Sequence, residues 1–235
     1  AVREHAEAGA DLIKLMVSGG YMTPGSAPWM CQYGRHEIET AVFESHQRGR
    51  KIAVHAHDTT GIRHSVEAGV DTIEHCTWLT PGGVHYEEET ALRIAESGIY
   101  VCLTVNERVK LWQGPEKEQW LERARAMREL GVRIIAGTDA GIRHVGHDRF
   151  IGALEAMREL GMTNEEILVS ATSLAAEACG IGEALGSLEA GKRADMLVVN
   201  GNPLERLEDL RRLERIIKGG EDMLPKLGER LGRAT

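Results

Sequence analysis

Four strand-like runs of this sequence end in a side chain that can bind a metal ion. Each run is mostly apolar, and a helical stretch directly follows three of them, so the polar residue lies where a buried strand emerges. The residues are Lys14 in DLIKLMV, His55 and His57 in KIAVHAH, His75 in DTIEHC, and Asp139 in VRIIAGTDAG. In a barrel of alternating strands and helices, the carboxyl ends of the strands carry the chemistry. The sequence therefore predicts one polar site at the mouth of a parallel barrel.

Strand and helix patterns alternate along most of the chain, which favours a parallel sheet with right-handed crossovers. The predicted strands cover about 11–17, 51–56, 70–75, 99–104 and 132–137. The predicted helices cover about 1–8, 36–48, 59–68, 86–97, 116–130, 148–160, 164–170 and 173–179. Glycines follow several of these helices, where a left-handed C-cap is needed: Gly49, Gly69, Gly98, Gly131 and Gly161.

The count of strand-helix units defines the predicted fold. Five units are present, whereas a closed barrel of this kind has eight and typically about 250 residues. The chain also begins without Met, on AVREHAEAGAD, which is typical of the last turns of a helix already under way. We therefore predict an α/β fold: a (β/α)8 TIM-type barrel that is truncated at its N-terminus.

The character of the sequence changes after Ile181. The segment LGSLEAGKRADMLVVNGNPL holds a Gly-rich turn and the short apolar strand ADMLVV, and RLERIIKGG supplies another strand. Two short strands are marginal by themselves, so we expect them to complete a small β-sandwich sheet. The predicted domains are a partial barrel over 1–182, β-sandwich strands over 183–220 and a tail over 221–235.

Composition narrows the classes of partner. The 235 residues are 42% hydrophobic, with a formal net charge of −8 and a pI near 5.7. A phosphate backbone favours clustered Lys and Arg, so neither nucleic acid nor an anionic membrane is the expected partner. No apolar stretch approaches the roughly 20 residues that cross a bilayer. The expected partner is a small-molecule substrate, and a homo-oligomer remains compatible with the sequence.

The cysteines indicate a reducing compartment. The chain has four, and they lie far apart without a CxxC pair: Cys31, Cys76, Cys102 and Cys179. This spacing suggests neither a disulfide framework nor a structural zinc knot. We therefore expect a cytoplasmic protein.

Three histidines are the strongest candidates for metal ligands. His55 and His57 alternate with Ala56 along one strand, so both imidazoles face the same side, and His75 ends the following strand. Histidine is a frequent zinc ligand. Taken singly, each could instead be a satisfied polar residue at a strand end, but three at adjacent strand ends converge.

Lys14 and Asp139 each allow a plain and a chemical interpretation. Lys14 lies in an otherwise apolar strand, where an ammonium is expensive to desolvate without a partner. It could pair with a carboxylate, or its neutral amine could react with carbon dioxide to give an anionic carbamate that bridges two metals. Asp139 lies in GTDAG, a tight turn that can also bring an acid close to a ligand. A carboxylate near an activated water can take its proton and later pass it to a leaving amine.

Together these segments resemble the metal-dependent amidohydrolase superfamily, in its prolidase-like and imidazolonepropionase-like branch. The resemblance rests on DLIKLMVSGG, IAVHAHDTTGIRHSVEAGVDTIEHC, GTDAG and GSLEAGKRADMLVV, which follow the family's order over nearly the whole chain. It implies that the segment present is the C-terminal portion of such a barrel, with strands four to eight.

The resemblance also implies roles for the candidate residues. Lys14 would be the carboxylated lysine that bridges two divalent ions, which we expect to be zinc. His55 and His75 would be ligands and Asp139 both ligand and catalytic acid–base, with His55 preferred to His57 because it lies 20 residues before His75 and 41 after Lys14. The family's first strand carries a His-x-His pair that completes the site, and no such pair precedes Lys14 here.

His57 would then face the substrate. We expect Tyr21, on the long loop after the Lys14 strand, and His144, after the Asp139 turn, to contact the substrate too, although either could be a plain surface residue.

The implied function is hydrolysis of amide or peptide-like C–N bonds by a hydroxide on the metal, in linear dipeptides or acyl amino acids. Two alternatives stay open. The same centre could open a cyclic amide, as in an imidazolonepropionase-like enzyme. The chain could also be an inactive fragment or a metal-binding module, because it lacks the first-strand histidines.

Overall fold

The computed structural model describes residues 1–225, which form two compact units. The first unit combines Ala1–Thr104 with Trp112–Gly137. The second combines Val105–Leu111 with the chain from Thr138 onwards. The domain boundaries expected from the sequence stay predictions, as do any features of 226–235, which lie outside the described residues.

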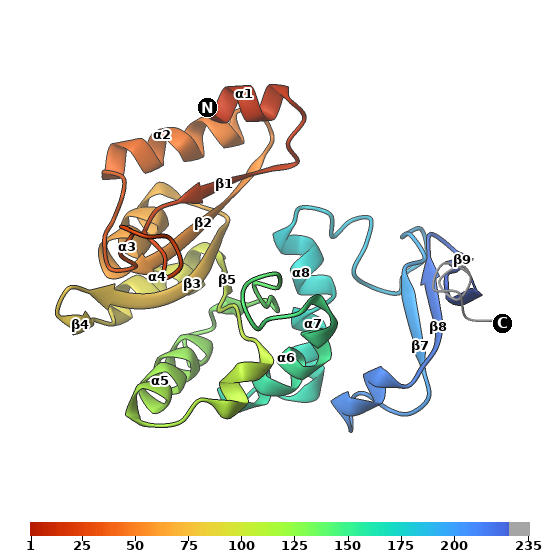
Figure 1. Cartoon of the computed structure of the whole chain (residues 1–235). Coiled ribbons are helices and arrows are strands. Elements are labelled where there is room, and N and C mark those ends of the chain that lie inside the picture. The colour runs from red at the N-terminus through yellow and green to blue at the C-terminus, as the bar shows by residue number, and fades with distance from the viewer. Residues whose placement is uncertain (226–235) are drawn as a thin grey trace. The chain divides into compact units, whose positions relative to one another are not determined.

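The first unit is built on a parallel sheet whose strands lie side by side in chain order, β1-β2-β3-β5-β6. Figure 1 labels the first four of these strands. The strands are β1 Leu12–Met16, β2 Lys51–Asp58, β3 Thr72–Thr80, β5 Tyr100–Cys102 and β6 Arg133–Ile134. The helices of this unit are α1 Val2–Glu7, α2 Arg35–His46, α3 Thr59–Ala68, α4 Glu88–Ser97 and α5 Pro115–Glu129. This α/β alternation around a parallel sheet confirms the predicted fold class at that level.

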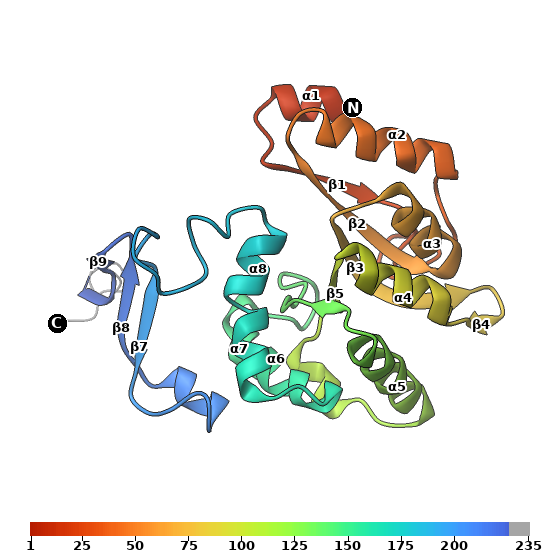
Figure 2. The same cartoon turned by 180° about the vertical axis from the view of Figure 1, so that it is seen from behind.

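The two faces of this sheet differ in what they carry. On one face Val54 of β2, Ile73 of β3 and Val101 of β5 are paired neighbours and all 0% exposed. Helices α2, α3 and α4 lie along this face (Figure 2). The opposite face carries the next residue of each strand, so that His55 pairs with Glu74 and Glu74 with Cys102. The polar side chains thus gather on the face away from these helices.

Helix ends in this unit follow the sequence signals. Asp58 is the N-cap of α3, where its carboxylate accepts from the backbone N–H of Gly61 at 2.7 Å. Gly69 and Gly98 close α3 and α4 in the left-handed conformation, with φ of 77° and 71°. Gly161 also caps a helix end in the left-handed conformation, so the prediction is confirmed for these three glycines. Gly49 and Gly131 have positive φ too, but they lie just past the C-caps of α2 and α5.

Three strands differ most in length from the sequence expectation. β3 runs on to Thr80 because the turn at Pro81 folds it back on the two-residue strand β4, Gly83–Val84. β5 stops at Cys102 and β6 covers only Arg133–Ile134, so both are shorter than expected. An apolar run marks where a strand passes through the core, whereas its ladder of hydrogen bonds depends on the neighbouring strand.

The second unit holds short helices and a small sheet. The helices are η1 Glu107–Leu111, η2 His147–Arg149, α6 Phe150–Ala156, η3 Met157–Leu160, α7 Asn164–Ser170, α8 Ser173–Ala178 and η4 Leu207–Arg211. The sheet is antiparallel, in the order β7 Met196–Val199, β8 Leu213–Lys218 and β9 Glu221–Asp222. The first two are the strands that the sequence predicted, and β9 lies in the segment predicted as a tail.

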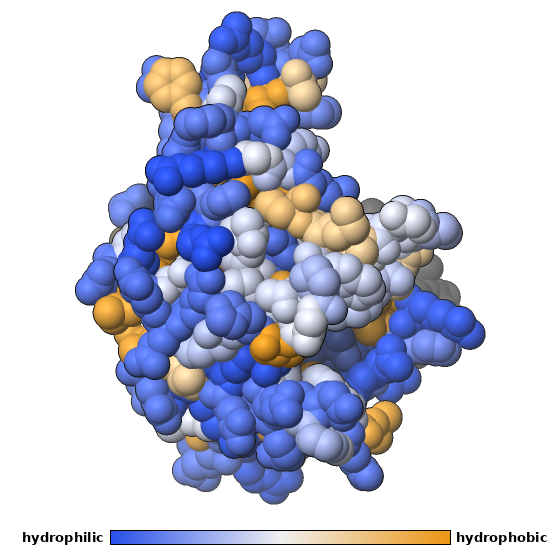
Figure 3. Space-filling model, turned by 90° about the vertical axis from the view of Figure 1, so that its left-hand side faces the viewer, coloured by the Kyte–Doolittle hydropathy of each residue, from blue (hydrophilic) through white to orange (hydrophobic). Residues whose placement is uncertain are grey.

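The face of the molecule drawn in Figure 3 is mostly hydrophilic, with apolar residues in separate patches. None of the helices among residues 1–225 has both the length and the apolar character needed to span a bilayer.

Candidate metal centre

Three imidazoles come together near the carboxyl end of β2 and the neighbouring part of β3. The ring centroids of His55 and His57 are 4.6 Å apart, and that of His75 lies 4.4 Å from the first and 4.3 Å from the second. One ring nitrogen from each lies within 4.8 Å of the other two, so the group could hold a metal ion. The convergence that the sequence predicted for these histidines is therefore present within one unit.

The regular geometry of β2 places two of the three rings. Successive side chains of a strand point to opposite faces, so His55 and His57 share a face while Ala56 between them is 0% exposed on the other. The backbone N–H of His57 donates to the hydroxyl of Ser18 at 2.8 Å, which ties the end of β2 to the segment after β1. Alternation alone is enough to explain both positions.

His75 reaches the same site by a different route. It pairs with Ala56, so regular alternation would point it at the helix-covered face. Instead its φ is 70°, Cys76 and Trp78 also have positive φ of 51° and 63°, and the register with β2 shifts here. These left-handed residues break the alternation, and the imidazole turns to stack on His57.

Each imidazole has an oxygen partner that orients its ring. Nδ1 of His57 lies 2.9 Å from the hydroxyl of Thr77, and Nδ1 of His75 lies 2.9 Å from the hydroxyl of Thr104. The Thr77 hydroxyl donates to the backbone carbonyl of His57 at 3.3 Å, so it accepts from Nδ1–H and the lone pair of that ring is on Nε2. Nε2 of His55 is 3.1 Å from the carbonyl of Gly19, to which it donates. Such partners fix the tautomer of a ligating histidine.

Burial keeps two of these rings neutral. It lowers the pKa of His57 from 6.5 to about 3, with a smaller contribution from the charge of His55. It also lowers the pKa of His75 from 6.5 to about 2, helped by His57, His55 and Lys14. A neutral imidazole is the form that binds a metal, so the protonation state and the clustering both fit a divalent ion such as zinc.

Lys14, Glu74 and Cys102 surround the histidines on the same face of the sheet. The charge of Lys14 acts on both His75 and Cys102, and Glu74 hydrogen-bonds the Cys102 thiol. Burial raises the pKa of that thiol well above its ordinary value. The apolar neighbours of Lys14 in the sequence suggested that its side chain is buried, but it is exposed. Leu12 and Met16, on the same side of β1, are likewise 42% and 44% exposed, so this side of the strand is uncovered.

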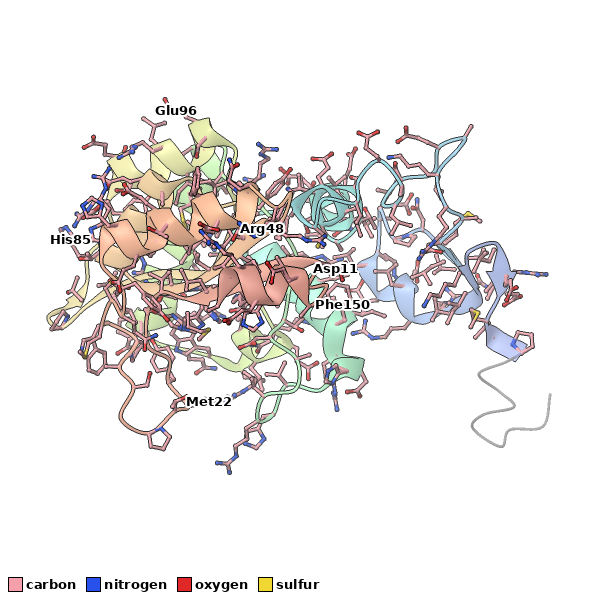
Figure 4. All side chains as sticks on the ribbon, turned by 90° about the horizontal axis from the view of Figure 1, so that it is seen from above. Asp11, Met22, Arg48, His85, Glu96 and Phe150 are labelled. Carbon is pink, nitrogen blue, oxygen red and sulfur yellow. The ribbon has the colours of Figure 1, made fainter. Side chains whose placement is uncertain are left out.

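The loop after β1 brings Tyr21 to the histidines. The loop is closed at its base, because the side-chain amide of Gln32 donates to the carbonyls of Met16 and Ser18, both at 2.8 Å. The ring of Tyr21 meets His57 edge to face, with centroids 5.1 Å apart. Met22 lies on the same loop, which extends away from the sheet in Figure 4. Tyr21 is thus a predicted substrate contact that touches a histidine of this group.

Asp139 and His144 belong to the second unit. Both are exposed, and both have positive φ, of 56° and 68°. A left-handed backbone at two non-glycine residues so close in sequence marks a tight, unusual turn. Their roles as ligand and substrate contact stay predictions.

Several residues of this site were not expected from the sequence. Thr77 lies two residues past the end of its predicted strand, and Thr104 is the last residue of its predicted strand. Comparing the hydroxyls near the ends of neighbouring strands would have found both. Cys102 and Glu74 lie on the histidine face by alternation along their strands. Gly137 carries no side chain where a Cβ would overlap the Cys102 sulfur, a contact that only the structure reveals.

A parallel sheet with three imidazoles gathered near the carboxyl end of β2 defines an α/β protein with a candidate metal site. The chain belongs to the Amidohydrolase family, whose match covers residues 1–223. The resemblance inferred from the motifs is thereby confirmed, and with it the assignment to a family of enzymes.

Several of the matching proteins and structures have named activities. The chain is 28% identical to the ochratoxinase of Aspergillus niger over 94% of its own length and 48% of that protein. It is 27% identical to the imidazolonepropionase of Shouchella clausii over 81% of its length and 42% of that protein. The structure of a Xaa-Pro dipeptidase with bound methionine superposes with a TM-score of 0.80 and 32% identity, covering 94% of this chain and 56% of the dipeptidase. The chain thus spans about half the length of the relatives that it matches.

Proposed function

We propose that this chain carries part of the metal site of a hydrolase that cleaves amide bonds in dipeptides or acyl amino acids. The observation that carries the proposal is the cluster of His55, His57 and His75 at the strand ends of an Amidohydrolase-family sheet. Among the structural relatives are the Xaa-Pro dipeptidase and a prolidase complexed with N-methylphosphonate-L-proline, the latter 28% identical over 94% of this chain. Both descriptions favour linear, peptide-like substrates.

The residues that would hold the metal are those whose chemistry fits a divalent cation. His55 and His75 would supply neutral nitrogens, Asp139 a carboxylate, and Lys14 a carbamate formed with carbon dioxide. The closeness of Lys14 to His75 supports its inclusion, because its charge acts on that ring. Zinc suits such mixed nitrogen and oxygen ligands, and when bound it would lower the pKa of a water and polarise the substrate carbonyl.

The remaining steps fall to the side chains of the chain itself. Asp139 would accept a proton from the attacking water and return it to the departing amine, which conserves the proton over the reaction. His57, Tyr21 and His144 would contact the substrate. The edge-to-face contact of Tyr21 with His57 supports a shared binding surface for two of them.

The sheet would be one part of a (β/α)8 barrel. Leu12 and Met16 are apolar yet exposed on the histidine face, as expected where further strands pack in the complete protein. The relatives are about twice as long as this chain, which is compatible with a first half that supplies the remaining strands and the His-x-His pair.

Exchange of the proposed acid–base tests this function. In the full-length protein Asp139→Asn should lower kcat for a dipeptide by about 10²–10⁴-fold, the contribution typical of general acid–base catalysis. Asp148→Asn is the matched control, because it removes a carboxylate that is 78% exposed from the same segment. Near-normal turnover of Asp139→Asn with metal bound would refute the proposal.

A cyclic-amide hydrolase is the second candidate, favoured by the matches to imidazolonepropionases. Kinetics on linear and cyclic amides of similar size would separate the two functions, and we expect the larger kcat/KM for the linear ones. The remaining alternative is an inactive fragment or a metal-binding module without catalysis. Metal analysis by mass spectrometry combined with hydrolysis assays separates the two: less than one bound ion per chain with no hydrolysis supports an inactive fragment, and one bound ion with no hydrolysis supports a metal-binding module.

A further inference from the structure

Thr104 stands in a backbone conformation that its residue type disfavours. It follows β5, and its φ is 51°. The left-handed region suits glycine and asparagine, whereas a β-branched residue there is a genuine outlier. Such strain persists only where the surrounding structure imposes it, and it concentrates at functional sites. The contacts of Thr104 indicate what the strain achieves.

Those contacts reach directly into the histidine cluster. The Thr104 hydroxyl lies 2.9 Å from Nδ1 of His75, and its backbone N–H donates to the Cys102 thiol. His75 is left-handed too, with φ of 70°. Two residues with positive φ on neighbouring segments of the sheet thus meet through one hydrogen bond.

We propose that Thr104 is a positioning residue that engages Nδ1 of His75, so that Nε2 is the nitrogen presented to the metal. The inference rests on the proposed metal site, and it assigns a task to a residue that itself binds neither metal nor substrate. Outer hydroxyls and carboxylates of this kind typically change metal affinity by about 10–100-fold when they are removed.

Three substitutions separate this role from simple packing. Thr104→Val keeps the branched shape and the strained backbone but removes the hydroxyl. Thr104→Ser keeps the hydroxyl and loses only a methyl group. Thr104→Gly removes the hydroxyl and relieves the backbone, because glycine adopts positive φ without steric cost.

The measurement is Zn²⁺ affinity of the metal-free full-length protein by calorimetric titration, with Co²⁺ absorption spectra as a report on ligand geometry. Thr104→Val should weaken Zn²⁺ binding about 10–100-fold, and Thr104→Ser should stay close to the wild type. Thr104→Gly should also weaken binding while its Tm is at or above that of the wild type. Thr80→Val is the control, because Thr80 donates to the Gly83 carbonyl in the β3–β4 turn, away from the histidines.

Several outcomes would overturn the inference. An unchanged Zn²⁺ affinity in Thr104→Val would overturn it. A loss of affinity in all three variants that is proportional to their loss of Tm would also overturn it. A wild-type protein that binds no Zn²⁺ would remove both this inference and the proposed metal site. A protein that shows the expected affinity pattern and hydrolyses no amide would refute the proposed function alone.

Discussion

Strands β2 and β3 bring histidines to the same site by opposite means. In β2 the imidazoles of His55 and His57 share a face because the strand is regular, and the intervening Ala56 packs on the other face. In β3 the paired residue His75 would lie on the face of Ala56, and a left-handed backbone turns it back. One strand places its ligands through periodicity and the other through strain.

The difference shows where structural information for the site resides. A regular strand needs only the right residues two positions apart, and it places their side chains on one face without backbone strain. The bent part of β3 needs neighbours that hold Cys76 and Trp78 in an unfavourable conformation. Substitutions at residues other than the histidines should therefore weaken metal binding more when they lie in β3 than when they lie in β2.

The largest effect is expected at Trp78. Its side chain is 0% exposed and its ring meets Tyr86 edge to face at 5.1 Å, so Trp78→Ala should lower the free energy of unfolding by about 3–5 kcal/mol. Urea denaturation of the metal-free protein measures this loss.

The matched control for that change is Val54→Ala in β2, which removes an equally buried side chain from the regular strand. Zn²⁺ affinity should fall markedly in Trp78→Ala and change little in Val54→Ala. The two variants are compared under conditions where both are folded to the same extent. Equal losses of Zn²⁺ affinity would then show that β2 and β3 support the site in the same way, and the contrast between the strands would be wrong.

The regular part of the molecule could be read from the sequence. Apolar runs followed by helical patterns gave the order of β1, β2, β3, β5 and β6, and glycine positions gave the helix ends. The same periodicity put His55 and His57 on one face. These features follow from local preferences that each segment expresses by itself.

The rest depends on contacts between segments. Alternation along β3 gives the wrong face for His75, and no residue type in DTIEHC signals a positive φ there. The hydroxyl partners Thr77 and Thr104 follow from the register of three strands, which is set by packing. The role of Asp139 stays a prediction for a related reason, since that residue belongs to the second unit.

An intermediate effect is expected when the pH is lowered. The folded-state pKa of His57 is about 3, below the ordinary 6.5, so between these values the unfolded chain binds more protons. Stability is then complete above about pH 6.5 and falls below it, at up to about 1.4 kcal/mol per pH unit for one histidine. Urea denaturation of the metal-free protein between pH 4 and 7 measures the slope.

His57→Gln should make that slope shallower, because it removes a ring that only the unfolded chain protonates. The comparison variant His36→Gln removes an imidazole that is 96% exposed on α2 and should keep the wild-type slope. If His57→Gln and the wild type lose stability in parallel, burial of this ring does not contribute to acid sensitivity, and β2 holds its histidines under less constraint than we infer.

The smallest effect is expected at Thr77, and it tests how the histidines of β2 divide their work. Thr77→Val removes the hydroxyl that meets Nδ1 of His57 but leaves His55 and His75 with their own partners. Because we assign His57 to the substrate, Zn²⁺ affinity should change by less than the roughly tenfold minimum expected behind a metal ligand, while KM for a dipeptide rises. A loss of affinity as large as that of Thr104→Val would instead make His57 a ligand. The regular strand would then supply two of the metal's nitrogens, and the strained strand only the third.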